Sequence, residues 1–157
     1  MPDLKSVVDA ADGRAMDRDG ATDAITEAVK AAGDPVVLAV HSGTGFSGYA
    51  ASDRVPERIA AMVYVDTAPG IGALDPEQEG DKPLVWSEIE GGENLDGLSD
   101  EQKETFRQRA VPVPGGVLRG SVELTNEARR DIPSTLICTG FSAEEYQTYA
   151  REHPEWA

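Results

Sequence analysis

The chain has 157 residues, a length that suits one domain. It carries 29 acidic against 14 basic residues, a formal net charge of −15, which argues against binding nucleic acid or an anionic membrane. No apolar run approaches the roughly eighteen residues of a membrane span, and residues 1–20 lack an apolar signal core, so we expect a cytoplasmic protein. Cys138 is the single cysteine, which excludes an internal disulfide and argues against a cysteine-based metal site.

The N-terminal part predicts one helix and then a strand. Residues 1–20 are rich in Asp, Gly and Ala and are predicted to form a loop. Thr22 or Asp23 can cap a helix, in which apolar residues recur at helical spacing until Ala32. The following run, PVVLAV, is apolar throughout, which predicts a strand buried on both faces of a parallel sheet.

A second helix and a second strand follow this run. The stretch GFSGYAASDRVPERI is rich in small residues, which let a helix lie close against a sheet. The apolar run from Ile59 to Val65 predicts the second strand, and Asp66 ends it. Residues 36–66 therefore predict a β-α-β crossover unit, with two parallel strands.

Residues 67–131 predict an insertion of the cap or lid type. They contain turn-rich acidic sequence, one or two helical turns in LVWSEIEGG, and a capping box at 99–102 that opens a helix to about Ala110. A connector, VPVPGGV, and a short helix near 125–130 complete it. The acidic stretch 75–101 lacks the ligand spacing of a calcium loop and is expected to be a solvated face.

The C-terminal part predicts a third strand and a last helix. The strand covers residues 134–138, and a second capping box, Ser142 to Glu145, opens a helix through Ala150. The sequence thus predicts an α/β fold with a three-stranded parallel sheet, flanking helices and one domain over residues 1–157.

The turn after the first strand predicts a nucleophile elbow. Such a turn places a serine between a strand and a helix, usually as Gly-x-Ser-x-Gly. Here the pentapeptide is VHSGT, so Val40 and Thr44 replace the two flanking glycines, and Gly45 follows one position late. Ser42 is therefore either a nucleophile or only a hydroxyl where a strand meets a helix.

The longer run VVLAVHSGTGFSGYAASDRVPERIAAMVYVDTAP resembles the alpha/beta-hydrolase superfamily, in its esterase and hydroxynitrile-lyase-like branch. The resemblance continues through LSDEQKETFRQRAVPVPGGVLR and RRDIPSTLICTGFSAEEY and covers residues 20–157. It implies a partial alpha/beta-hydrolase fold, because the family's strands before the elbow and its histidine loop after the last strand have no counterpart. We therefore expect a chain truncated at both ends.

The resemblance also implies roles for residues around the elbow. Ser42 would be the nucleophile that attacks an ester carbonyl, and the Gly43 N–H would be one oxyanion donor. The substrate would be a small-molecule ester, and no metal or organic cofactor is expected. A lyase on the same fold, or a non-catalytic binding domain that lacks the family histidine, are the alternatives.

The base and the acid of a triad remain open. His41 is adjacent to Ser42, and neighbours at a strand tip point to different sides. His153 precedes Pro154 near a helix end, where a surface role is the better interpretation. Asp66 is either the acid or a residue that ends a strand by binding backbone groups. For Glu144 and Glu145 we favour a structural role.

Other candidates have ordinary structural explanations. Trp86, Phe106 and Trp156 are predicted to pack the cap and the last helix, and Trp86 can also line an acyl pocket. Tyr49 is predicted to be helix packing, and Cys138 a small buried hydrophobe. With no neighbouring strand, the apolar edges of the first and third strands predict self-association.

Overall fold

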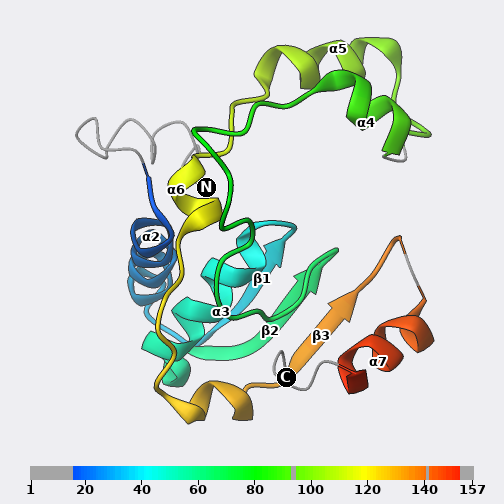
Figure 1. Cartoon of the computed structure of the whole chain (residues 1–157). Coiled ribbons are helices and arrows are strands. Elements are labelled where there is room, and N and C mark those ends of the chain that lie inside the picture. Colours follow the sequence, from blue (N-terminus) through cyan, green and yellow to red (C-terminus); the bar gives the residue numbers. More distant parts are fainter. Residues whose placement is uncertain (1–15, 93–94, 141, 153–157) are drawn as a thin grey trace.

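The computed structural model describes residues 16–92, 95–140 and 142–152. Three parallel strands form one sheet in the order β1 (Val36–His41), β2 (Ile59–Val65) and β3 (Ser134–Ile137) (Figure 1). This confirms the predicted α/β class and its three-stranded parallel sheet. The α-helices are α2 (Arg18–Ala31), α3 (Thr44–Arg54), α4 (Trp86–Gly92), α5 (Asp100–Arg109), α6 (Gly115–Arg119) and α7 (Ala143–Glu152), and the short 3-10 helices are η1 (Pro56–Arg58) and η2 (Glu127–Asp131).

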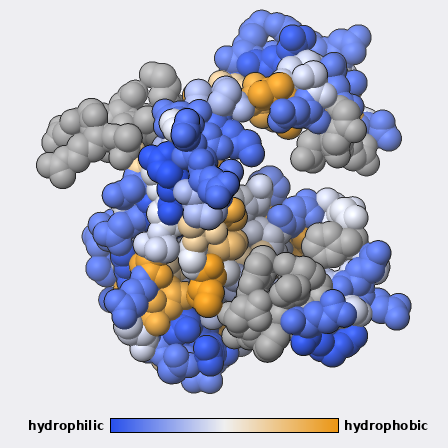
Figure 2. Space-filling model, viewed as in Figure 1, coloured by the Kyte–Doolittle hydropathy of each residue, from blue (hydrophilic) through white to orange (hydrophobic). Residues whose placement is uncertain are grey.

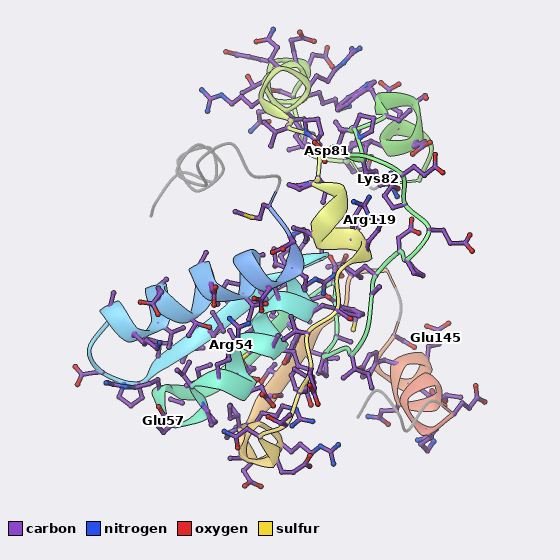
Figure 3. The ribbon with its side chains drawn as sticks, turned by 60° about the vertical axis from the view of Figure 1, so that its left-hand side comes forward. Arg54, Glu57, Asp81, Lys82, Arg119 and Glu145 are labelled. Carbon is purple, nitrogen blue, oxygen red and sulfur yellow. The ribbon has the colours of Figure 1, made fainter. Side chains whose placement is uncertain are left out.

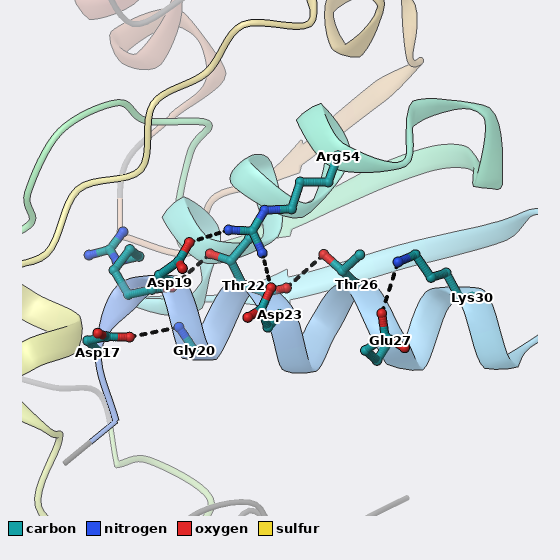
Figure 4. A network of polar contacts seen from close by, with 10 residues as sticks. Asp17, Asp19, Gly20, Thr22, Asp23, Thr26, Glu27, Lys30 and Arg54 are labelled. Atoms are coloured by element: carbon teal, nitrogen blue, oxygen red, sulfur yellow. Dashed lines mark hydrogen bonds and ion pairs between the residues drawn. The ribbon is translucent and has the colours of Figure 1, made fainter. Parts of the chain in front are cut away.

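Helix α2 begins earlier than the sequence predicts. Asp17 is its N-cap, and the Asp17 carboxylate accepts a hydrogen bond from the Gly20 N–H at 2.8 Å. The predicted cap at Thr22 or Asp23 is wrong, because Thr22 lies inside the helix and its hydroxyl donates to the carbonyl four residues earlier. In Figure 4, Arg54 of α3 reaches across to Asp19 and Asp23, so two ion pairs join α2 to α3.

The core lies on one face of the sheet. Helices α2 and α3 pack there, and Val40, Met62 and Tyr64 point into the same apolar cluster. On the other face Val37 is 62% exposed and Ile137 is 47% exposed. The prediction that the first strand is buried on both faces is therefore wrong: no described helix covers the second face of β1, whose residues alternate in exposure.

Residues 67–131 leave the sheet after β2 and return to it at β3. Helices α4 and α5 stand apart from the sheet, on the side toward which the carboxyl ends of the strands point (Figure 1). Their stem is an antiparallel bridge in which Lys82 and Val113 exchange two backbone hydrogen bonds of 2.8 Å. At its base Asp81 accepts from the Gly115 N–H at 2.9 Å, and Arg119 donates to the Gln78 carbonyl at 2.7 Å (Figure 3).

Two predictions within this insertion have clear outcomes. The helix opened by Ser99 and Gln102 has both hydrogen bonds of a capping box, as predicted. The stretch predicted as a plain connector instead contains α6, which begins after Pro114. A Cβ on Gly115 would lie 1.9 Å from the Gly80 carbonyl oxygen, so glycine permits the close packing at the start of this helix.

The surface agrees with the acidic composition. Hydrophilic residues cover most of the face seen in Figure 2, with apolar residues in separate areas over the sheet-bearing part and over the part formed by α4 and α5. Among the described residues, no helix combines the length and the apolar character that crossing a membrane requires.

Candidate active site

Ser42 occupies a strained turn at the carboxyl end of β1. Its φ angle is +49°, a left-handed conformation that costs a non-glycine residue about 1–2 kcal/mol. The Ser42 N–H donates to the Val65 carbonyl at 3.1 Å, and the Ser42 carbonyl accepts from the Gly45 N–H at 3.0 Å. Ser42 is exposed, and α3 begins two residues later. The fold therefore presents this hydroxyl at the edge of the sheet where parallel α/β folds bind ligands.

Gly48 in α3 makes room for the valine that replaces the first glycine of the pentapeptide. Val40 stands two residues before Ser42, where the family pattern has glycine. Its side chain is 5% exposed and lies against Gly48, where an added Cβ would be only 2.4 Å from the Val40 Cγ1 atom. The close packing of β1 against α3 is thus permitted by a glycine in the helix, Gly48, and not by a glycine in the strand.

Gly45 takes the place of the second glycine of the pentapeptide, one position later in the chain. A Cβ on Gly45 would lie 2.2 Å from the Thr67 hydroxyl oxygen and 3.0 Å from the Ala68 carbonyl oxygen, so Gly45 makes the close approach to the loop after β2. Thr44 is exposed instead. The Thr44 hydroxyl donates to the His41 carbonyl at 2.7 Å and accepts from the His41 N–H at 3.0 Å.

The first turn of α3 offers backbone donors next to Ser42. Gly43 is the N-cap of α3 and provides no side-chain cap, and no described group accepts from the Gly43 N–H. The helix N-terminus favours negative charge at this point. Leu74 lies beside Gly43: its Cδ1 atom is 3.8 Å from a Cβ built on that glycine.

Asp66 repeats the geometry of Ser42 on the neighbouring strand. Its φ angle is +46°, and its N–H donates to the Ile137 carbonyl at 2.8 Å. The Asp66 carboxylate accepts from the Thr139 N–H at 2.6 Å and from the Thr139 hydroxyl at 2.7 Å. These hydrogen bonds, the hydroxyl's first, lower the pKa of Asp66, and the charge of His41 lowers it further. Asp66 therefore ties the ends of β2 and β3 together as an ionised group.

The role of Thr139 could not be predicted from the sequence. It lies 73 residues after Asp66 and contacts it because β2 and β3 are neighbours in the sheet. A residue with a positive φ angle thus follows the carboxyl end of both β1 and β2: Ser42 after β1 and Asp66 after β2. The structural interpretation of Asp66 has direct support in these hydrogen bonds, and its exposure leaves the carboxylate accessible at the same edge as Ser42.

The structure brings no described base to Ser42. His41 is exposed beside it, and no side chain of the described residues hydrogen-bonds the Ser42 hydroxyl. His153 and Trp156 lie outside the described residues. Glu144 is exposed, whereas Glu145 forms the predicted capping box: its carboxylate accepts from the Ser142 N–H at 2.7 Å, and its own N–H donates to the Ser142 hydroxyl at 3.2 Å.

The aromatic candidates mostly pack against other side chains. Trp86 lies in α4, edge-to-face with Phe106 at 5.9 Å between ring centres, and the Arg107 guanidinium lies 5.0 Å from the Trp86 ring centre. This is the predicted packing within the insertion, and among the described residues the ring contacts of Trp86 are to Phe106 and Arg107, not to the turn at Ser42. Tyr49 is buried against the Arg129 guanidinium, in agreement with a packing role.

The remaining predictions concern Cys138 and metal binding. Cys138 is half-buried at the end of β3 rather than fully buried. In the part of the chain that the structure describes, no group of three or more His, Cys, Asp or Glu residues is placed to hold a metal ion.

Comparison with known proteins identifies the fold. No protein-family model and no curated protein matches the sequence. Among solved structures, the chain is similar to an extracellular alpha/beta-hydrolase from a Paenibacillus species, described as sharing structural and functional homology with tobacco salicylic acid binding protein 2, with a TM-score of 0.65 and 20% identity. The match covers 80% of this chain and 60% of that one. A variant of PytH is also found, at a TM-score of 0.42 and 15% identity, over 91% of this chain and 80% of that one.

The fold is therefore that of part of an alpha/beta-hydrolase, and the chain spans about three fifths of the length of the Paenibacillus protein. The predicted fold class and the resemblance stated from the sequence are confirmed at this level. At 20% identity, the chemistry of this chain rests on its own residues.

Proposed function

We propose that this chain carries the nucleophile of a carboxylic ester hydrolase, and that Ser42 is that nucleophile. The observation that carries the proposal is the positive φ of Ser42 at the carboxyl end of β1. A serine bears this strain at a strand-to-helix turn, where glycine would adopt it freely, and the turn exposes the hydroxyl.

The reaction follows from the groups at this turn. The Ser42 oxygen attacks the carbonyl carbon of an ester, and the serine proton passes to a base. The Gly43 N–H donates to the oxygen on which negative charge develops. Collapse of the tetrahedral intermediate expels the alcohol, which takes the proton from the base. A water molecule then gives a proton to the base as it attacks the acyl-serine, and the release of the acid returns that proton to Ser42.

The candidates for the base and the acid of the reaction are the two histidines and one carboxylate. Of the two histidines in the chain, His41 adjoins the nucleophile and His153 lies outside the described residues. Asp66 is the carboxylate at the correct edge of the sheet, and its low pKa keeps it ionised at neutral pH. In this proposal Asp66 contributes negative charge near the site, which favours neutral ester substrates over anionic ones.

Residues 67–131 act in this proposal as a cap that selects the substrate. Support comes from the position of α4 and α5 toward the carboxyl ends of the strands (Figure 1) and from Leu74 of this segment, which lies beside Gly43. In this proposal Trp86, at the start of α4, lines the acyl pocket of the cap.

A second candidate function is non-catalytic binding. It is favoured by one observation: no described side chain hydrogen-bonds the Ser42 hydroxyl, so no described group activates it. A general base typically contributes about 10²–10⁴-fold to the rate, and its absence would leave only slow acylation.

Hydrolysis of short-chain p-nitrophenyl esters distinguishes the two. Wild-type protein is compared with Ser42→Ala and with Ser87→Ala, an exposed serine in the insertion that serves as the matched control. Turnover that is lost in Ser42→Ala and kept in Ser87→Ala supports the hydrolase. Equal residual rates in all three proteins contradict it and favour the binding function.

A further inference from the structure

The Thr44 side chain closes a loop around the strained turn. Its hydroxyl hydrogen-bonds the backbone of His41 twice, donating to the carbonyl at 2.7 Å and accepting from the N–H at 3.0 Å. Ser42 lies between these two residues, so both bonds span the residue with the positive φ angle. We propose that Thr44 is a positioning residue: its hydroxyl holds the peptide groups of His41 and thereby fixes the orientation of Ser42.

The direction of the His41 groups explains why a hydroxyl is needed there. In a strand, the N–H and C=O groups of successive residues point to opposite sides. Because the Ser42 N–H donates to β2 at Val65, the His41 groups point to the other side, where β1 has no neighbouring strand in the described sheet. The Thr44 hydroxyl occupies that place and satisfies both groups at once.

The role of Thr44 is local, which makes it testable apart from folding. Thr44 is exposed and belongs to none of the buried clusters, so replacing it removes no core packing. It also stands where the family pattern has glycine, a residue that could make neither hydrogen bond. In this chain Gly45 makes the close approach to Thr67 and Ala68, and Thr44 adds a side-chain tether to the His41 backbone.

Hydrogen exchange tests the tether without reference to catalysis. We compare wild-type protein with Thr44→Val, which keeps the shape and removes the hydroxyl, and with Thr44→Ser, which keeps the hydroxyl. In Thr44→Val we expect the His41 amide to exchange about tenfold faster, as loss of one hydrogen bond implies, and in Thr44→Ser to exchange at the wild-type rate. Equal exchange rates in all three proteins would overturn the proposal.

The second readout rests on the proposed function of Ser42. The rate constant for labelling of Ser42 by a fluorophosphonate, measured per folded molecule, should fall about tenfold in Thr44→Val and recover in Thr44→Ser. The matched control is Thr148→Val, since the Thr148 hydroxyl donates to a backbone carbonyl in exposed α7 at 3.0 Å. It should leave both readouts unchanged.

The two readouts separate the two ideas. If wild-type protein does not label at all, the nucleophile proposal fails, and the exchange of His41 still decides whether Thr44 holds the turn. If wild-type protein labels and Thr44→Val labels at the same rate, Thr44 is not a positioning residue, whatever its effect on the melting temperature.

Discussion

The contact between Val40 and Gly48 makes a quantitative prediction about how this turn tolerates a valine. Replacing Gly48 by alanine adds a methyl group 2.4 Å from the Val40 Cγ1 atom, inside a site where Val40 is 5% exposed. Overpacking of this kind costs about 1–3 kcal/mol, whereas alanine in place of a helical glycine contributes about 1 kcal/mol of stability. We expect Gly48→Ala to lower the free energy of unfolding by up to about 2 kcal/mol.

The same substitution should have the opposite sign once the clash is removed. In a Val40→Ala background, the Cγ1 methyl group that crowds Gly48 is absent, so Gly48→Ala should stabilise the protein by about 1 kcal/mol through helix propensity alone. The coupling energy between the two sites is then about 1–3 kcal/mol. Val40→Ala itself is expected to cost about 1.5 kcal/mol, from the loss of buried apolar groups.

Urea denaturation followed by far-ultraviolet circular dichroism measures all four proteins of this cycle. The midpoint should move while the slope m stays constant. If Gly48→Ala changes the free energy of unfolding by the same amount in both backgrounds, the two residues do not compete for space. The explanation of how the chain replaces the first glycine of the pentapeptide would then be wrong.

Three further predictions concern the salt bridge, the strand ends and the open edge. Asp53→Ala should lower the free energy of unfolding by up to about 3 kcal/mol, because it removes the buried carboxylate 3.1 Å from Arg129 and leaves only the exposed carboxylate of Glu127 at 3.7 Å, and a second change, Arg129→Met, should recover part of the loss in thermal melts. Thr139→Val should raise the pKa of Asp66 in a carbon-detected NMR titration, because it removes the hydroxyl that lowers this pKa. Since the ionised form of Asp66 is the one stabilised in the folded protein, Thr139→Val should be less stable than wild-type protein at neutral pH, and the difference should shrink as the pH falls below about 4. A difference in stability that does not depend on pH would refute this linkage. Self-association through β1 stays a prediction: the apparent mass in sedimentation velocity should rise with concentration in wild-type protein and not in Val37→Lys, and a concentration-independent monomer would speak against it.

The strands were predictable because each is a compact apolar run bounded by turn residues. The run from Ile59 to Val65 becomes β2 with the expected bounds. The start of α2 was missed because residues 1–20 have the composition of a loop, and Thr22 has the residue type of a cap. The cap is Asp17, and Thr22 instead faces the core, where its hydroxyl bonds to its own helix.

The one-sided burial of β1 could not be predicted from its composition. An apolar run such as PVVLAV has no alternation that would show which face lacks a covering helix. The exposure of Val37 depends on which elements pack against the sheet, and this is a property of the tertiary structure.

The candidate site was only partly predictable for the same reason. The sequence shows Ser42 after an apolar strand and before a helix rich in small residues, which is a local pattern. The compensations at Gly48 and Thr44 depend on how α3 lies against β1, and the bonds from Thr139 to Asp66 join residues far apart in the chain. The order of strands, turns and helices was visible in the sequence, and the side-chain contacts between these elements were not.

Reaction with a fluorophosphonate, read by intact mass, tests most directly whether the turn at Ser42 holds a nucleophile. Such a probe reacts with activated serines and leaves ordinary hydroxyl groups unmodified. We predict one label per wild-type chain and none in Ser42→Ala. A folded wild-type protein that stays unlabelled would contradict the account and would mean that the strained turn survives only as architecture.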